Sequence, residues 1–256
     1  QPNDNQPDEN TPETETPSVP EEENPELSEE EQVPSEEESD TDTGEESQED
    51  ASDQKTGSTE GKSSIESLAR LLPARKDYHW QYEGTAEYGH NMTLNSIQKS
   101  KDRYIYKITG EVDDMSGGES DRDFSLQITY TVEPDVIIQE KKEQVMMDSE
   151  FSRLELIRGP LTTGTAWLQK VKDKKGKVTT LRCTITGVTK DGAQKIYSVY
   201  YKDQNSNYYE KRKIKEGVGI IFFEKLYTDS EGDYTIGYTL TPSGTGYINN
   251  MQIKFL

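Results

Sequence analysis

From residue 78 onward, apolar and polar side chains alternate along most of the chain. Tyr78, Trp80 and Tyr82 alternate with polar neighbours, and the same period of two recurs over residues 124–132 and 234–240. This period is typical of strands with one buried and one solvated face. Turn signals rich in Asp, Asn and Gly separate the segments every 8–15 residues, which favours antiparallel hairpins. The pattern predicts roughly twelve strands.

A different period precedes the strands. Ser63 and Glu66 have the spacing of a capping box, with Ser63 as the expected N-cap. Ile65, Leu68, Leu71 and Leu72 then fall on one helical face, and Pro73 ends the segment. The sequence therefore predicts one short amphipathic helix that docks on the strands.

Glycines flank Val218 just before a strand, residues 219–223, that is apolar on both faces. Glycine at such positions permits a bulge or a close backbone approach, which a curling sheet requires. The expected fold class is mainly β: one curved antiparallel sheet or half-barrel of roughly twelve strands with a short N-terminal helix, preceded by a disordered acidic tail.

The charge is distributed very unevenly. Residues 1–62 contain 23 Asp and Glu but only two Lys, a net charge of −21 that equals the charge of the whole chain. The same residues contain no aromatic side chain and few aliphatic ones. Such a segment does not bury enough apolar surface to offset the entropy of ordering it. We expect residues 1–62 to be a disordered acidic tether and residues 63–256 to be a β-rich globular domain.

Residue types that carry catalysis are scarce. The chain has one cysteine, Cys183, and two histidines, His79 and His90. Cys183 alternates with polar residues on the apolar face of an expected strand, which favours a buried core thiol over a reactive one. The sequence holds no Gly-x-Ser-x-Gly, phosphate-loop or HExxH motif. We expect no enzymatic activity and no cofactor.

An acidic run over residues 113–123 resembles an oxygen-rich calcium loop, but its spacing does not match the EF-hand pattern. A solvated hairpin tip is the favoured interpretation, so no metal site is expected.

Two basic runs lie over residues 170–177 and 211–215, the second just after Tyr208 and Tyr209. Lysine is common on exposed strands, where it protects sheet edges from mispairing. Contact with an anionic cell-wall polymer, or with the chain's own tail, is the alternative. Nucleic acid is disfavoured as a partner, because the domain is neutral and the tail would repel phosphate.

Three segments occur in a recognisable order: Gly159–Trp167, Thr184–Val188, and Tyr208-Tyr209 followed by Gly217–Ile220. This order resembles a pattern in uncharacterised surface lipoproteins of Gram-positive bacteria with a Tyr-Tyr…Gly-Val-Gly hairpin. The chain departs from that pattern where residues 211–216 lengthen the link before Gly-Val-Gly. The resemblance implies a half-barrel related to lipoprotein carriers, with a concave face that holds acyl chains. It supplies no catalytic residue.

The resulting hypothesis is an extracytoplasmic, cell-surface binding or interaction module that holds a lipid or other apolar ligand. It would touch the membrane only through a lipid anchor on a cysteine outside this sequence. The alternative is a structural or assembly protein of the cell surface, with a surface protein as partner and no small ligand. The residues expected to line the ligand site are Trp80, Tyr82, Trp167, Phe222 and Tyr238, unless they simply fill the core between sheet and helix.

Overall fold

The structure is a computed structural model that describes residues 64–84, 89–146 and 148–247. All of these residues belong to one compact unit, Thr56–Leu256. The predicted disordered tether, residues 1–62, lies outside the described residues.

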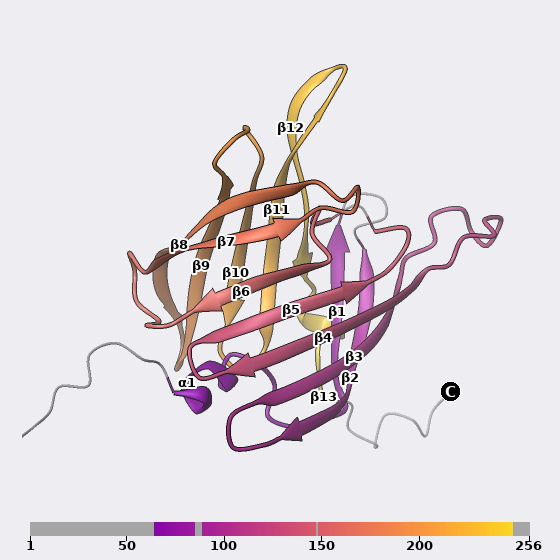
Figure 1. The fold of residues 1–256 in the computed structure, drawn as a ribbon. Helices are drawn as coiled ribbons and strands as arrows, with labels where there is room; N and C mark the ends of the chain where they lie inside the picture. The colour runs from indigo at the N-terminus through magenta and orange to yellow at the C-terminus, as the bar shows by residue number, and fades with distance from the viewer. Residues whose placement is uncertain (1–63, 85–88, 147, 248–256) are drawn as a thin grey trace, which may run out of the picture. The chain divides into compact units, whose positions relative to one another are not determined.

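Antiparallel strands form a single sheet that curls into a nearly closed barrel (Figure 1). The strand order is β6-β5-β4-β3-β2-β1-β12-β11-β10-β9-β8-β7, and β13 pairs with β1 outside this path. The mainly β fold predicted from the alternating pattern is therefore confirmed. The strands are β1 Tyr78–Gly84, β2 His90–Lys99, β3 Tyr104–Val112, β4 Ser125–Glu133, β5 Val136–Lys142, β6 Arg153–Arg158, β7 Ala166–Lys172, β8 Val178–Asp191, β9 Gln194–Asp203, β10 Tyr209–Lys215, β11 Gly219–Asp229, β12 Gly232–Leu240 and β13 Gly246–Tyr247.

One short α-helix, α1 (Ile65–Ala69), packs at the end of the barrel where the β10–β11 hairpin turns. The N-cap is Ser64, whose hydroxyl accepts a hydrogen bond from the Ser67 amide, so the expected cap at Ser63 was one residue too early. Leu68 and Leu71 are fully buried. The Gly217 amide donates to the Arg70 carbonyl at 2.7 Å and ties the helix to the hairpin.

The curl of the sheet is helped by bulges. Between β10 and β11, Lys213 pairs with Phe222 while Ile214 pairs with Ile220, so Ile221 is the additional residue. A bulge of this kind bends a strand and increases its twist. Gly219 has φ +92°, and a Cβ there would lie 3.5 Å from Leu72 of the segment after α1. The glycine therefore allows β11 to begin with a positive φ directly against that segment.

The barrel has a seam between β6 and β7, which run side by side at the front of Figure 1. These two strands share no regular ladder. The side-chain amide of Gln169 bridges them instead: its Oε1 accepts from the Glu155 amide at 2.7 Å, and its Nε2 donates to the Glu155 carbonyl at 3.0 Å. A bridge between Phe151 and Asp173 lies further along the seam. One glutamine thus takes the place of a backbone partner.

The segment between β5 and β6 closes the end of the barrel opposite α1. It contacts the β9–β10 turn, because the Tyr208 hydroxyl accepts from the Glu150 amide at 3.3 Å. Its residues Val145, Met146 and Ser149 are buried. The interior is thus covered by a helix at one end and by this segment at the other. No helix among the described residues is both long and apolar enough to cross a membrane.

Candidate functional site

Three of the five residues expected at a ligand site lie together in the barrel interior. Trp80, Tyr82 and Tyr238 are at least nine-tenths buried, and the rings of Tyr82 and Tyr238 meet edge to face at 5.1 Å. The Trp80 Nε1–H donates to the Val218 carbonyl at 2.7 Å, and the Tyr82 hydroxyl donates to the Ile220 carbonyl at 2.8 Å. The polar atoms of Trp80 and Tyr82 are thus used to hold the start of β11.

The other two residues lie apart from this group: Trp167 is on the inner face of β7 at the edge of the core, and Phe222 is outside the barrel. Trp167 of β7 is half-buried and packs edge to face on Tyr201 at 6.4 Å. Phe222 lies on the outer face of β11, since its neighbour Phe223 points into the core. The alternation along β11 therefore separates Phe222 from the interior group.

A cleft beside α1 has a volume of about 380 Å³, and we call it the helix-side cleft. Its apolar walls include Leu72, Tyr106 and Tyr247, and the cations Arg70 and Lys99 stand among its lining residues. The Lys99 ammonium lies 5.3 Å from the centre of the Tyr104 ring. The full lining is Glu66, Ala69, Arg70, Leu72, Ala74, Lys99, Tyr104, Tyr106, Gly217 and Tyr247. The amphipathic helix was the only sequence signal for this cleft, because the tyrosines come from strands far apart in the chain.

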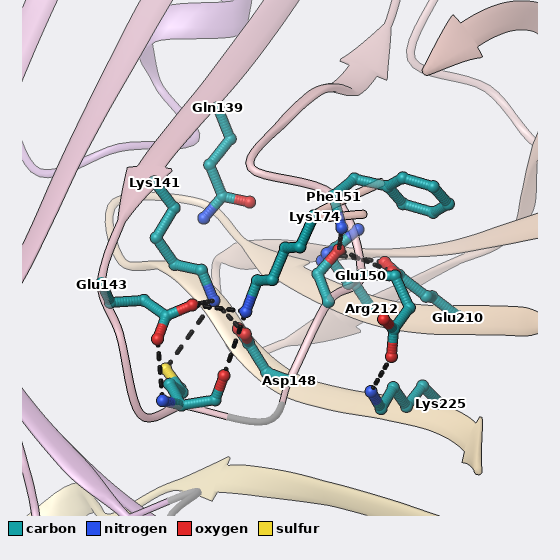
Figure 2. Close-up of polar contacts among 12 residues, drawn as sticks. Gln139, Lys141, Glu143, Asp148, Glu150, Phe151, Lys174, Glu210, Arg212 and Lys225 are labelled. Carbon is teal, nitrogen blue, oxygen red and sulfur yellow. Dashed lines mark hydrogen bonds and ion pairs between the residues drawn. The ribbon is translucent and has the colours of Figure 1, made fainter. Parts of the chain in front are cut away.

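Charged side chains gather around the β5–β6 segment (Figure 2), and Asp148, Glu210, Arg212 and Lys225 among them are buried. We call this group the ionic cluster. Four cations face four carboxylates: Lys141, Lys174, Arg212 and Lys225 against Glu143, Asp148, Glu150 and Glu210. Charges removed from water cost several kcal/mol each unless they are paired and hydrogen-bonded. The ion pairs therefore allow Lys141, Arg212, Lys225, Glu143, Asp148 and Glu210 to be buried, whereas the side chains of Lys174 and Glu150 stay 37% and 43% exposed at the edge of the cluster.

The β5–β6 segment supplies three of the four carboxylates. Asp148 pairs with Lys141, Glu143 pairs with Lys174 at 2.5 Å, and Glu150 pairs with Lys225 at 2.6 Å. The cations come from the strands and the β7–β8 turn around it. The ion pairs thus fix this segment across the end of the barrel.

Arg212 and Lys225 are the two fully buried cations of the cluster, and Arg212 lies between two aromatic rings. Its side chain is 2% exposed and lies between the rings of Tyr201 and Phe223, at 4.8 and 5.1 Å from their centres. One Nη pairs with Glu210 at 2.7 Å, while Nε and the other Nη have no hydrogen-bond partner among the described residues. Glu210 also accepts hydrogen bonds of 2.6 Å from the hydroxyls of Ser149 and Tyr208.

The pKa shifts follow from these contacts. Burial alone would raise the pKa of Asp148, but the Lys141 ammonium outweighs it and lowers the pKa below its usual value. Burial and the neighbouring Glu210 carboxylate raise the pKa of Tyr208. At neutral pH Asp148 is therefore charged, as its pair with Lys141 requires, and Tyr208 is protonated, as its hydrogen bond to Glu210 requires.

The residues considered for catalysis are held in structural contacts. Cys183 is fully buried, as predicted, and burial raises its pKa to about 12. His79 contacts the Thr93 hydroxyl at 3.2 Å, and buried His90 stacks on Tyr82 at 4.4 Å. At the acidic hairpin, Asp114 accepts from the amides of Ser116 and Gly118, both at 2.9 Å. Within the described part of the chain, no three His, Cys, Asp or Glu side chains are grouped to hold a metal ion.

Comparison with known proteins yields two remote structural similarities. No protein-family profile matches the chain, and no curated protein matches it. A candidate lipoprotein from Parabacteroides distasonis has 12% identity and a TM-score of 0.37. A candidate exported protein with a YmcC-like fold from Bacteroides fragilis has 8% identity and a TM-score of 0.39. Each match covers 66% of this chain and 96% of the other. Similarities of this size carry no conclusion about function.

Proposed function

We propose that this chain is a non-catalytic, extracytoplasmic binding module that holds a lipid or other apolar ligand in the helix-side cleft. The observation that carries the proposal is the cleft itself. Its volume of about 380 Å³ lies within the range of roughly 300–1,000 Å³ typical of small-molecule sites. Leu72 and Tyr106 offer apolar contact, and Arg70 and Lys99 offer charge for a carboxylate or phosphate head group.

The interior aromatic residues take a different part in this proposal from the one the sequence suggested. Trp80 and Tyr82 support the edge of the cleft, because they hold the carbonyls of Val218 and Ile220 next to Gly217, which lines the cleft. Tyr238 instead stacks on Phe223, which contacts Arg212 of the ionic cluster. A ligand in the cleft would lie between the helix and the sheet instead of inside the barrel. Trp80 would report its arrival without touching it.

The direct test is a titration of the full chain with palmitate and with phosphatidylglycerol vesicles, read by Trp fluorescence and by Tm. We expect a spectral change and a higher Tm, because a ligand that binds only the folded state stabilises it. Ala69→Phe should fill the cleft and abolish both effects. Lys107→Ala, an exposed lysine of β3 outside the cleft, is the matched control. Equal lipid effects in the wild type and Ala69→Phe would contradict the site.

The lipid anchor is a separate part of the proposal. It rests on the acidic, Pro-rich composition of residues 1–62 and on the sequence resemblance to surface lipoproteins. Labelling of the native host with an alkyne fatty acid, followed by purification of the protein, should yield a labelled product in the membrane fraction. An unlabelled product would contradict the anchor and leave the cleft proposal to its own test.

One observation favours a second candidate, a cell-surface structural or assembly protein without a small ligand. The barrel interior is filled by aromatic side chains such as Trp80, Tyr82 and Tyr238 and, beside Tyr238, by the ionic cluster. A filled interior suits a protein that works through its outer surface. This candidate leads if saturating lipid changes neither fluorescence nor Tm.

A further inference from the structure

Basic and aromatic side chains share the outer face of β8–β11. The sheet register places Arg182 beside Lys202, Tyr200 beside Lys211, and Lys213 beside Phe222. We call these six residues the basic–aromatic face. Arg182, Lys211 and Lys213 are exposed, whereas Lys202 and the two aromatic residues are partly buried. On this face the charged ends of the basic side chains are therefore more exposed than the rings of Tyr200 and Phe222.

Two hollows lie on either side of Phe222. One of about 280 Å³ is lined by Ser198, Tyr200, Lys211 and Lys213, and the other of about 460 Å³ continues across β11, β12 and β1. Phe222 borders both. The two hollows thus form a shallow groove that crosses neighbouring strands, which suits an extended chain better than a compact molecule.

The charges in the groove are arranged in two parts. Lys213 lies 5.3 Å from the centre of the Phe222 ring, and Lys211 pairs with Glu224 at 2.8 Å. Among the described residues, no carboxylate lies within ion-pair distance of Arg182, Lys202 or Lys213. Glu83 and Glu224 border the second hollow. The hollow lined by Lys211 and Lys213 therefore attracts anions, and the hollow bordered by Glu83 and Glu224 offers carboxylates that can accept hydrogen bonds from hydroxyl groups.

We propose that the basic–aromatic face binds an anionic polysaccharide. Its acidic groups would pair with Lys213 and with Lys211, which would exchange Glu224 for the ligand, since opposite charges on a surface attract at long range. Sugar rings would pack their C–H faces on Tyr200 and Phe222, whose flat rings are large apolar surfaces. Sugar hydroxyls would donate to the carboxylates of the second hollow. This surface is separate from the helix-side cleft, so it does not depend on the lipid proposal.

A polysaccharide is favoured over nucleic acid because only part of the groove is basic. A nucleic-acid strand would carry phosphate past Glu83 and Glu224, which repel it. Each sugar of an acidic polysaccharide also carries hydroxyl groups, which can face Glu83 and Glu224 as hydrogen-bond donors, whereas the phosphodiester backbone of a nucleic acid offers no such donor.

The test measures binding of the full chain to polygalacturonate, with dextran as the neutral polysaccharide and polyglutamate as the anionic polymer without sugar rings. We expect polygalacturonate to bind most tightly, and its affinity to fall as salt rises. Lys211→Ala with Lys213→Ala should weaken binding about tenfold. Lys107→Ala with Lys142→Ala, two exposed lysines on β3 and β5, is the matched control and should change little.

A second variant separates ring contacts from charge. Phe222→Leu keeps an apolar side chain but removes the flat ring, so it should reduce the preference for polygalacturonate over polyglutamate. The proposal is overturned if polygalacturonate does not bind, or if the control lysines matter as much as Lys211 and Lys213. Equal affinity for polyglutamate or for a DNA duplex would also overturn it, because charge alone would then explain the binding.

Discussion

The two ends of the barrel interior are built from the same strands but from opposite chemistry. Along β10, buried Ile214 lies toward α1, while Arg212 and Glu210 lie toward the β5–β6 segment. Along β11 the inward side chains change from Phe223 to Lys225 in the same direction. One continuous inner face therefore passes from apolar to ionic within a few residues of each strand.

The two ends contribute to the folded state in different ways. Burial of apolar area near α1 contributes free energy of folding directly. Buried ion pairs contribute little net stability, because the desolvation cost offsets the attraction, yet removal of one partner is costly. The apolar end therefore holds the fold together, and the ionic end determines where the β5–β6 segment lies.

The largest effect should come from Arg212→Met. This change leaves Glu210 buried without its cation, and loss of one partner of a buried pair typically costs about 3–5 kcal/mol. Urea denaturation followed by circular dichroism would measure it.

The matched variant removes both charges. Arg212→Met together with Glu210→Gln should cost clearly less than the sum of the two single changes, because neither partner is left charged alone. If the losses in unfolding free energy of the two single variants simply add up in the double variant, Arg212 and Glu210 are not coupled. The proposed difference between the ionic and the apolar end would then be wrong.

At the apolar end, Leu68→Ala should cost about 2–3 kcal/mol, the lower range for a buried leucine, since a short terminal helix has room to relax. No charge is exposed by this change, so its cost should be the same at low and high salt. A strong salt dependence would argue against a purely apolar contact at α1.

The ionic end should also make stability depend on pH. The folded-state pKa of Asp148 is lowered, so its contribution is complete above the ordinary Asp value of about 4 and is lost as pH falls below it through the folded pKa. Asp148→Asn should flatten this acid limb in a pH series of urea unfolding. Asp121→Asn, on an exposed turn, should leave the limb unchanged.

The smallest effect is expected at Cys183, which lies inside the barrel near the seam and accepts a hydrogen bond of 3.2 Å from Gln169. Cys183→Ala should cost on the order of 1 kcal/mol, as for a small core truncation. Its raised pKa, about 12, keeps the thiol protonated, so labelling by a thiol reagent should be slow in the native protein. Rapid labelling would mean that the interior opens readily at this point.

Much of the fold was predictable because a period of two is a local signal. The alternating residues of β1 and β4 each have one buried face, and the helix pattern around Leu68 is equally local. In β12 the same alternation was misleading, because Tyr234 is 44% exposed and only Tyr238 is buried. The seam between β6 and β7 was not predictable, because a glutamine side chain replaces a backbone ladder there. The N-cap at Ser64 was missed by one residue because consecutive serines at 63 and 64 offer the same chemistry.

The candidate sites were less accessible to sequence reasoning. The ionic cluster looked like ordinary surface charge, because Lys225 and Glu210 are exposed types that become buried only through partners far along the chain. One sign was present: Arg212 and Glu210 occupy the same face as Ile214 of their strand. The helix-side cleft depends on which strands meet beside α1. The alternation of apolar and polar residues identifies strands but does not indicate their order in the sheet.

The Gln169 bridge has a consequence for how copies of this protein behave in concentrated solution. Strands β6 and β7 would otherwise be two free sheet edges, and free edges invite pairing with other chains. By occupying the amide and carbonyl of Glu155, one side chain removes a docking point for a foreign strand. Gln169→Leu would leave the amide and carbonyl of Glu155 free to pair with another chain. We expect this variant to self-associate before it loses stability.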